Sequence, residues 1–256
     1  YSNNGILSAN QLYSWTSFAD KYVSAIDELI QEKRNIAGPS IPKTAYGKKL
    51  VNAEMFVISD IDGTLIDGEE VTGLKEFTAW IKEHRGKVVF GLASGRNRYM
   101  TEMIFTQHDL PKPDILICSA GSEIYYTEKF IPDKGWESYI DRQWKRQALQ
   151  MVLSDFPGIT LQEQDAQWRF KLSYYVEPDF NENTLANLYK LLDDHKLKAR
   201  ILLTENRFLD FLPFRASKGS AVRYLSSKWK IPIERFITAG NSGNDEDMLK
   251  GKMNGI

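Results

Sequence analysis

The amino-acid sequence predicts an α/β protein that is built on a mainly parallel β-sheet and carries an inserted α+β block. Short apolar runs alternate with stretches whose apolar residues recur at helical spacing, and this alternation is typical of βαβ units. From about residue 122 to residue 210 the rhythm changes to half-buried strands with fewer helices, which predicts a separate layer. The length of 256 residues suffices for one large or two modest domains.

Composition excludes several classes of function. Hydrophobic residues make up 42% of the sequence, enough for a substantial core. The formal net charge of −1 gives no electrostatic reason to expect a nucleic acid or an anionic membrane as partner. No apolar run reaches membrane-spanning length. The single cysteine, Cys118, lies in an apolar run and is expected to be a buried thiol, which fits a reducing, cytoplasmic location.

Residues 1–49 are expected to form an N-terminal helix and a linker. Apolar residues recur at helical spacing from Trp15 to Ile30, which predicts a helix over 14–33. This stripe is too apolar to face water along its length and needs a protein surface. The stretch 34–49 is polar and contains glycine and proline, which indicates a linker.

The core elements follow in order from residue 54. The apolar run 55–58 stops at a turn signal and predicts a buried central strand. The helix expected at 71–81 places Leu74, Phe77 and Trp80 on one face. Further strands are expected at 88–91, 115–118 and 236–237, and further helices after Ser94 and from Ser217.

The block between the core segments has predicted elements of its own. We expect a hairpin strand at 121–126, a long polar helix at 136–153, a strand at 169–176, a helix at 184–192, and strands at 200–204 and 207–212. The core then comprises 50–121 and 211–256, and the block comprises 122–210. The sequence stops at Ile256, where one more core strand is expected.

Two aspartates stand at the carboxyl end of the predicted central strand. Open α/β sheets bind ligands at this end, so Asp60 and Asp62 are candidate site residues. Two carboxylates can share a hard cation such as Mg²⁺ while one of them attacks phosphorus. Gly63 allows a sharp turn past the site, and Thr64 offers a hydroxyl. Taken alone, such a pair is more often a solvated turn.

Three further motifs strengthen the functional interpretation. Ser94, followed by Gly95 and Arg96, stands at the end of the second strand, where its hydroxyl can donate to a phosphate oxygen. Lys218 opens a helix and supplies a cation. The loop 240–245 follows another strand and ends in a carboxylate. Ser94 could instead be a helix N-cap, and Lys218 an exposed helix lysine.

The four motifs in this order resemble those of the haloacid dehalogenase superfamily of phosphohydrolases, over about residues 54 to 250. The resemblance implies a Rossmann-like core with a parallel sheet and an inserted α+β (C2-type) cap domain. It also implies that Asp60 is the nucleophile and that Asp62 is the general acid and base. The catalytic set implied is Asp60, Asp62, Ser94 and Lys218; the Mg²⁺ ligands are Asp60, Asp62, Asn241 and Asp245; and Thr64, Gly95, Arg96 and Asn244 are substrate contacts.

The segments 170–175 and 209–213 are similar to sucrose-phosphatases, in which a cap lysine contacts the sugar. The similarity makes Lys171 a candidate substrate contact. Glu123 at the hinge and Trp168 are further candidates. It implies hydrolysis of sucrose 6-phosphate to sucrose and phosphate, and another sugar or polyol phosphate stays open. Ordinary cap packing is the alternative role for these residues.

Asn241 departs from the superfamily pattern, which carries an acidic metal ligand at this place. An asparagine keeps an oxygen ligand and removes one negative charge from the site. Two interpretations follow: a phosphatase with weakened Mg²⁺ binding, or a phosphatase-like domain kept for interaction or regulation. The presence of the other catalytic residues favours the enzyme.

The segment 13–23 is similar to the closing helix of the glycosyltransferase half of sucrose-phosphate synthases. The similarity implies that the chain is the C-terminal part of such a synthase and that its partner is the glycosyltransferase domain of the same parent chain. A helix that packs on the domain described above is the alternative.

Overall fold

The structure is a computed structural model that describes residues 45–66 and 72–256. The chain divides into two units, Tyr1–Lys43 and Thr44–Ile256, and the description below concerns the second. The helix predicted at 14–33 lies outside the described residues. Within the described ranges, no helix combines the length and the apolar character that crossing a bilayer requires.

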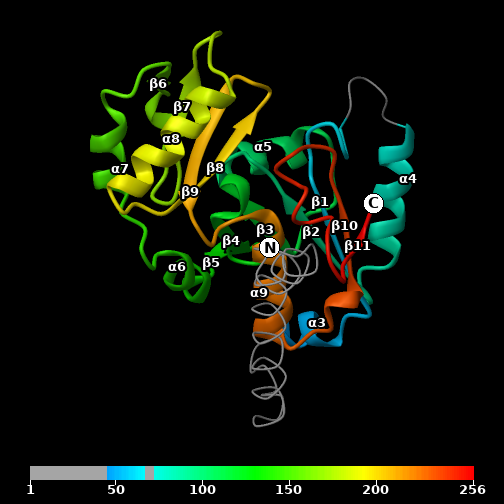
Figure 1. Ribbon diagram of the computed structural model, residues 1–256. Helices are drawn as coiled ribbons and strands as arrows, with labels where there is room; N and C mark the ends of the chain where they lie inside the picture. The colour runs from blue at the N-terminus through cyan, green and yellow to red at the C-terminus, as the bar shows by residue number, and fades with distance from the viewer. Residues whose placement is uncertain (1–44, 67–71) are drawn as a thin grey trace, which may run out of the picture. The chain divides into compact units, whose positions relative to one another are not determined.

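A seven-stranded sheet forms the core, in the order β11-β10-β1-β2-β3-β4-β5 (Figure 1). Five strands pair in parallel, and the last two pair antiparallel at one edge. The parallel strands are β1 (Met55–Ser59), β2 (Val88–Ala93), β3 (Ile115–Cys118), β10 (Phe236–Ala239) and β11 (Asn254–Gly255); the antiparallel ones are β4 (Glu123–Tyr126) and β5 (Ile131–Pro132). The predicted, mainly parallel sheet is confirmed.

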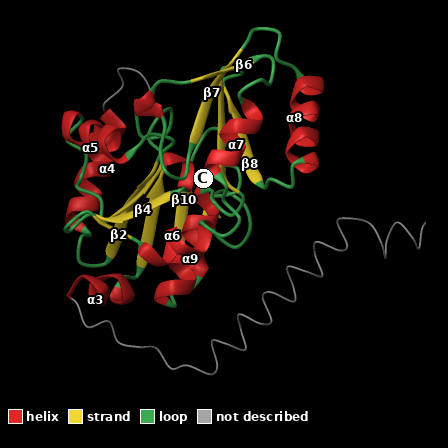
Figure 2. Cartoon of the chain, turned by 90° about the vertical axis from the view of Figure 1, so that its left-hand side faces the viewer, coloured by secondary structure: helices red, strands yellow, loops and turns green. Residues whose placement is uncertain are grey.

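Helices cover both faces of this sheet because its central strands are apolar on both sides. Phe56 and Ile58 of β1 pack in one hydrophobic cluster and Val57 in another. Figure 2 shows the sheet between two groups of helices. The helices α3 (Ala45–Asn52), α6 (Lys134–Ile140) and α9 (Lys218–Trp229) contribute to the first cluster, and α4 (Thr72–Glu83) and α5 (Arg98–Gln107) to the second.

A second, antiparallel sheet of four strands forms the cap, in the order β6-β7-β9-β8. Its strands are β6 (Ile159–Leu161), β7 (Leu172–Val176), β8 (Ala199–Thr204) and β9 (Phe208–Pro213), and its helices are α7 (Arg146–Leu153) and α8 (Glu182–Asp194). Leucines of both helices pack against Leu172, Tyr174, Leu209 and Phe211 on one face of the sheet. The strand residues between them therefore point to the opposite face.

Three details differ from the expected division of the chain. Strands β4 and β5 extend the core sheet, although residues from 122 onward were expected in the cap. Helix α3 occupies the end of the expected linker because Leu50 is buried in the core cluster. The helix expected at 136–153 is two helices, since Trp136 packs in the core cluster and Leu149 in the cap cluster.

The core strand expected near the end of the sequence is present in a minimal form. Strand β11 has two residues, and it pairs in parallel with Ile237 and Thr238 of β10.

Candidate active site

Three neighbouring strand ends bring the predicted motifs together. Strand β1 lies between β10 and β2, and all three run in parallel. Asp60, Ser94 and Gly240 follow these strands directly. They therefore lie together along the edge of the sheet that the carboxyl ends of the strands form. The Asp60 N–H donates to the carbonyl oxygen of Ala239 at 2.9 Å, which joins the first motif to the last.

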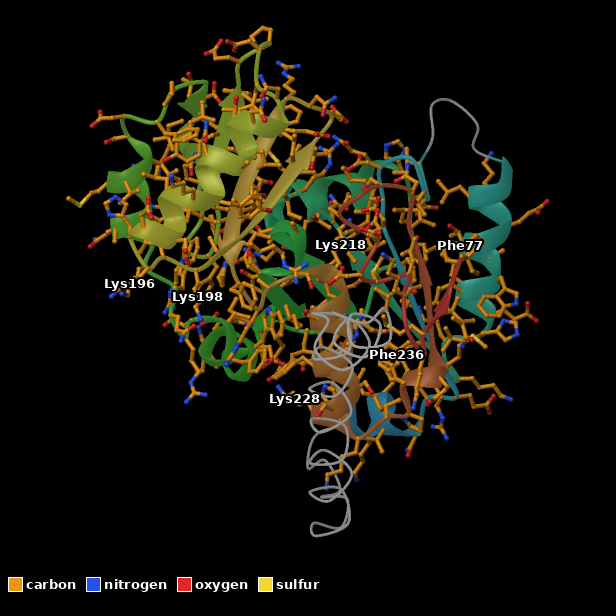
Figure 3. The ribbon with its side chains drawn as sticks, in the orientation of Figure 1. Phe77, Lys196, Lys198, Lys218, Lys228 and Phe236 are labelled. Carbon is orange, nitrogen blue, oxygen red and sulfur yellow. The ribbon has the colours of Figure 1, made fainter. Side chains whose placement is uncertain are left out.

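A buried ion cluster lies at this edge. The Lys218 ammonium donates to Asp60 Oδ1 and to Asp245 Oδ1, each at 2.7 Å. The exposed fractions of Asp60, Lys218 and Asp245 are 4%, 1% and 0%. Burial raises the pKa of Asp60, and the ammonium of Lys218 opposes that rise. Figure 3 labels Lys218 where the chain enters α9 from the cap.

The loop 240–245 is shaped by the carboxylate of Asp245. Its Oδ2 accepts the backbone N–H groups of Asn241 at 3.2 Å and Ser242 at 3.0 Å, and the Ser242 hydroxyl lies 2.9 Å away. A Cβ at Gly63 would lie 2.1 Å from Asn241 Nδ2, so the Asn241 side chain packs directly on the turn of the first motif. The first and last motifs therefore touch.

Asp62 has a different partner from Asp60. Arg96 donates Nε and Nη2 to the two carboxylate oxygens of Asp62, both at 2.9 Å, in the bidentate geometry that guanidinium and carboxylate favour. This pair is about half exposed. The carboxylate of Asp62 is thus directed at Arg96 rather than at the cluster of Asp60 and Asp245.

A cavity of about 830 Å³ lies between the core and the cap. Of the residues that the sequence singled out, Asp60, Asp62, Gly95, Arg96, Trp168, Lys171, Asn241 and Asn244 line its wall. The others named at the site lie outside that wall: Thr64, Ser94, Glu123, Lys218 and Asp245. Ser94 is fully buried, and its Oγ accepts the Arg96 N–H at 3.1 Å. The hydroxyl of Thr64 is buried without a hydrogen-bond partner.

The oxygen donors of the wall suit a hard cation. Asp60, Asp62 and Asn241 provide two carboxylates and one amide oxygen, which are ligands that Mg²⁺ prefers. No group of three or more acidic, histidine or cysteine side chains within the described ranges has an arrangement that could hold a metal ion. The three carboxylates among the four predicted ligands are therefore not gathered around one point, because Asp62 pairs with Arg96 and Asp245 with its own loop.

Asp210 belongs to the cavity and was missed by the sequence analysis. It lies on β9 and forms an ion pair with Lys171 at 3.1 Å. The sequence pattern could have indicated this position, because Asp210 stands between the apolar residues Leu209 and Phe211, which pack in the cap cluster. A charged residue between two buried ones on a strand must point to the other face, and here that face is the cavity.

Three comparisons with known proteins bear on this site. The model of the family "Sucrose-6F-phosphate phosphohydrolase" matches residues 53–256. Sucrose-phosphatase 2 of Nicotiana tabacum is 31% identical over 204 residues, which are 77% of this chain and 48% of that protein. The chain thus spans about half the length of the curated relatives that it matches.

Solved structures agree with these matches. The sucrose-phosphatase of Synechocystis sp. PCC6803, solved in complex with sucrose and phosphate, superposes with a TM-score of 0.73 at 26% identity, over 79% of this chain and 82% of that one. The haloacid dehalogenase-like hydrolase yhjK of Bacillus subtilis gives a TM-score of 0.58 at 20% identity, over 80% of each chain, and so shows the fold alone. The chain has the haloacid dehalogenase fold and belongs to the sucrose-6F-phosphate phosphohydrolase family.

Proposed function

We propose that this chain is a Mg²⁺-dependent phosphohydrolase for a sugar phosphate, with sucrose 6-phosphate as its substrate. The observation that carries the proposal is the position of Asp60. It is a buried carboxylate at the cavity wall, held at one oxygen by Lys218. Membership of the sucrose-6F-phosphate phosphohydrolase family supports the choice of substrate.

In the proposed reaction Asp60 attacks the phosphorus atom. Lys218 holds Oδ1 of Asp60, which leaves Oδ2 for the attack, and its ammonium opposes the rise in the pKa of Asp60 that burial causes. The bond between phosphorus and the sugar oxygen breaks, and Asp62 gives a proton to that oxygen. Asp62 then takes a proton from water, which hydrolyses the aspartyl-phosphate. Its pairing with Arg96 has to open for Asp62 to carry that proton.

Mg²⁺ would reduce the repulsion between the Asp60 carboxylate and the phosphate dianion. Asp60, Asp62 and Asn241 would hold it once Asp62 has turned away from Arg96, since all three residues line the cavity. Gly95, Arg96 and Asn244 line the core side of the cavity, where they would receive the phosphate. Ser94 is buried behind this wall, and its Oγ accepts the Arg96 N–H there.

The cap side of the cavity suits a sugar. Lys171, Asp210, Gln162 and Tyr175 supply charged and neutral hydrogen-bonding groups around the space opposite Asp60. Sugar hydroxyls both donate and accept hydrogen bonds, so such a mixed lining can satisfy them.

A second candidate function rests on Asn241. A site that lacks one acidic ligand and pairs Asp62 with Arg96 would also serve a phosphatase-like domain that binds a sugar phosphate without hydrolysing it. In that case the domain regulates or contacts a glycosyltransferase domain of the same parent chain. The cytoplasmic location stays a prediction.

Phosphate release tests the two candidates. The protein is incubated with sucrose 6-phosphate, trehalose 6-phosphate or glucose 6-phosphate at graded Mg²⁺ concentrations and with EDTA. We expect the fastest release from sucrose 6-phosphate, loss of release in EDTA, and none from Asp60→Asn, because an amide cannot attack phosphorus. Binding of sucrose 6-phosphate by calorimetry without release at any Mg²⁺ concentration would support the regulatory domain instead.

A further inference from the structure

Glu123 is a buried carboxylate that the proposed reaction does not use. It lies on β4 of the core sheet with 6% of its surface exposed, and it does not line the cavity. Ser119 Oγ donates to its Oε2 at 2.8 Å, and the Tyr125 hydroxyl donates to its Oε1 at 2.6 Å. Burial raises its pKa, and these hydrogen bonds oppose the rise. Burial of a carboxylate costs desolvation free energy unless hydrogen-bond donors replace the lost water.

The third donor to Glu123 comes from the cap. The indole Nε1–H of Trp168 donates to Glu123 Oε1, and Trp168 lines the cavity. The contact is therefore a hydrogen bond between the two lobes that ends on a buried carboxyl group. An indole N–H bonded to a carboxylate makes a stronger hydrogen bond than one bonded to a neutral acceptor. The other polar contacts between the lobes are longer: Asn97 Nδ2 to the Asp165 carbonyl at 3.4 Å, Arg200 to Asp247 at 3.8 Å, and the exposed Arg169 to Asp141 at 3.3 Å and to Glu137 at 3.7 Å.

Trp168 is coupled to Lys171 through a tight turn. The Trp168 N–H donates to the Lys171 carbonyl oxygen at 3.1 Å, and the Lys171 N–H donates to the Trp168 carbonyl oxygen at 3.2 Å. Arg146 Nε also donates to that Trp168 carbonyl oxygen, at 3.0 Å. A displacement of the indole therefore moves the backbone of Lys171, whose side chain reaches the cavity beside Asp210.

We propose that Glu123 is a positioning residue: through Trp168 it fixes the turn 168–171 over the core and so places Lys171 for recognition of the sugar. This role replaces the direct substrate contact expected from the sequence, and it rests on the proposed function. The order of contacts runs from Glu123 on the core sheet to the Trp168 indole and then to the Lys171 backbone.

Three variants test the contact. Glu123→Ala removes the acceptor, Trp168→Phe removes the donor and keeps an aromatic ring, and Glu123→Gln keeps an acceptor oxygen for the indole. Trp229→Phe is the matched control, because its indole donates to the Tyr126 hydroxyl at 3.0 Å and it does not line the cavity.

The first readout is hydrogen exchange measured by mass spectrometry, which needs no activity. We expect Glu123→Ala and Trp168→Phe to speed exchange in the segment 164–171 by at least tenfold and to leave strands β1 to β3 at the parent rate. Glu123→Gln should restore most of the protection, and Trp229→Phe should not affect this segment. Parent exchange rates at 164–171 in both Glu123→Ala and Trp168→Phe would overturn the proposal.

The second readout is the kinetics of sucrose 6-phosphate hydrolysis. We expect KM to rise at least tenfold in Glu123→Ala and Trp168→Phe and to rise no further in the double variant, while kcat falls by a smaller factor. An unchanged KM, or a fall in kcat alone, would contradict the positioning role. If the parent protein hydrolyses no sugar phosphate, the proposed function fails, and hydrogen exchange still decides whether Glu123 holds the turn.

Discussion

At the scale of the residue, charge balance decides what the site can do. Two buried carboxylates, Asp60 and Asp245, share the ammonium of Lys218. Without that cation the two carboxylates would repel each other in a poorly solvated place, and at least one would take up a proton. Asn241 lines the same cavity with a neutral amide, so its replacement changes the charge available to a metal without removing a catalytic group.

Asn241→Asp should strengthen Mg²⁺ binding. A carboxylate near a divalent ion gains Coulomb energy, and even about 1.4 kcal/mol that survives desolvation and repulsion lowers the half-saturating Mg²⁺ concentration tenfold. We expect this shift together with faster turnover, and a lower melting temperature without metal because the cavity that Asp60 lines then holds one more carboxylate. Mg²⁺ titrations of phosphate release and of melting temperature measure both effects.

Asn183→Asp is the matched control for this charge, because Asn183 is exposed on α8 of the cap. It should leave the Mg²⁺ requirement at the parent value. If Asn241→Asp also leaves it there, position 241 does not face the metal. A gain in affinity without turnover would favour the regulatory domain.

At the scale of the element, close backbone contacts set the position of Lys218. The short 3₁₀-helix Ser119–Gly121 packs against the start of α9. A Cβ at Gly121 would lie 2.1 Å from the Ser217 carbonyl carbon and 2.4 Å from the Lys218 nitrogen, and the φ of Gly121 is +93°. Only glycine fits both the conformation and the space.

Gly121→Ala should therefore destabilise the protein by about 1–3 kcal/mol and lower phosphatase activity through displacement of Lys218. Chemical denaturation measures the first effect and phosphate release the second. Gly86→Ala is the control, because nothing lies within 4 Å of a Cβ at Gly86. Its stability should stay within about 1 kcal/mol of the parent value. An equal effect of both substitutions would refute the steric argument.

The buried carboxylate of Asp133 connects three elements of the core: β4, α6 and α9. Its carboxylate accepts the Tyr126 hydroxyl of β4 at 2.6 Å, the Trp136 N–H of α6 at 3.1 Å and the Lys228 ammonium of α9 at 2.6 Å. Burial acts to raise the pKa of Asp133, but these bonds outweigh it, and the pKa lies below its usual value. The ionised form therefore stabilises the fold above the usual pKa, and this contribution is lost as the pH falls through the lowered one.

Lys228→Met should cost about 1.5–3 kcal/mol at pH 7, towards the lower figure because the Lys228 side chain is 33% exposed. The loss relative to the parent protein should shrink as the pH falls through the lowered pKa of Asp133, because protonation of Asp133 removes the ion pair in the parent as well. Melting temperatures of both proteins from pH 3 to pH 8 measure this trend. Lys190→Met, on the exposed face of α8, should show no such trend. A loss that stays constant with pH would show that Lys228 acts by packing alone.

At the scale of the whole molecule, the two lobes divide the proposed task. The core supplies Asp60 and Lys218. The cap presents Lys171 and Asp210 to the cavity, on the side of its sheet opposite to the helices α7 and α8. The cap has a hydrophobic cluster of its own, and Trp144 packs against both this cluster and the core cluster, which also holds Phe170 of the turn 168–171. We therefore expect substitutions on the cap side of the cavity to act first on binding of the sugar.

Lys171→Met should raise KM for sucrose 6-phosphate about 10- to 100-fold, the loss expected for a hydrogen bond to a charged group. Hydrolysis of p-nitrophenyl phosphate, which has no sugar, should fall by less. Steady-state kinetics on both substrates measure the difference. Lys198→Met is the control, since Lys198 is exposed in the cap and does not line the cavity (Figure 3). An equal loss on both substrates would place Lys171 in the chemistry.

The sequence by itself determined the class of fold and the edge of the sheet at which the site lies. Apolar runs such as 55–58 and 115–118 form strands because their pattern and length are local properties. Asp60, Ser94 and the loop 240–245 could be placed together because parallel strands end at one edge. The family was also indicated by the sequence, because its four motifs occur in a fixed order along the chain.

Only the tertiary structure decided which surfaces and side chains pair. Strand β4 joins the core sheet because Ile117 and Ile124 pair across it. The helix expected at 136–153 is divided into α6 and α7 because Trp136 packs in the core cluster and Leu149 in the cap cluster. Arg96 faces Asp62 and Trp168 faces Glu123 across 34 and 45 residues of sequence. Such contacts depend on how distant segments meet in space, and neither periodicity nor motif spacing encodes that geometry.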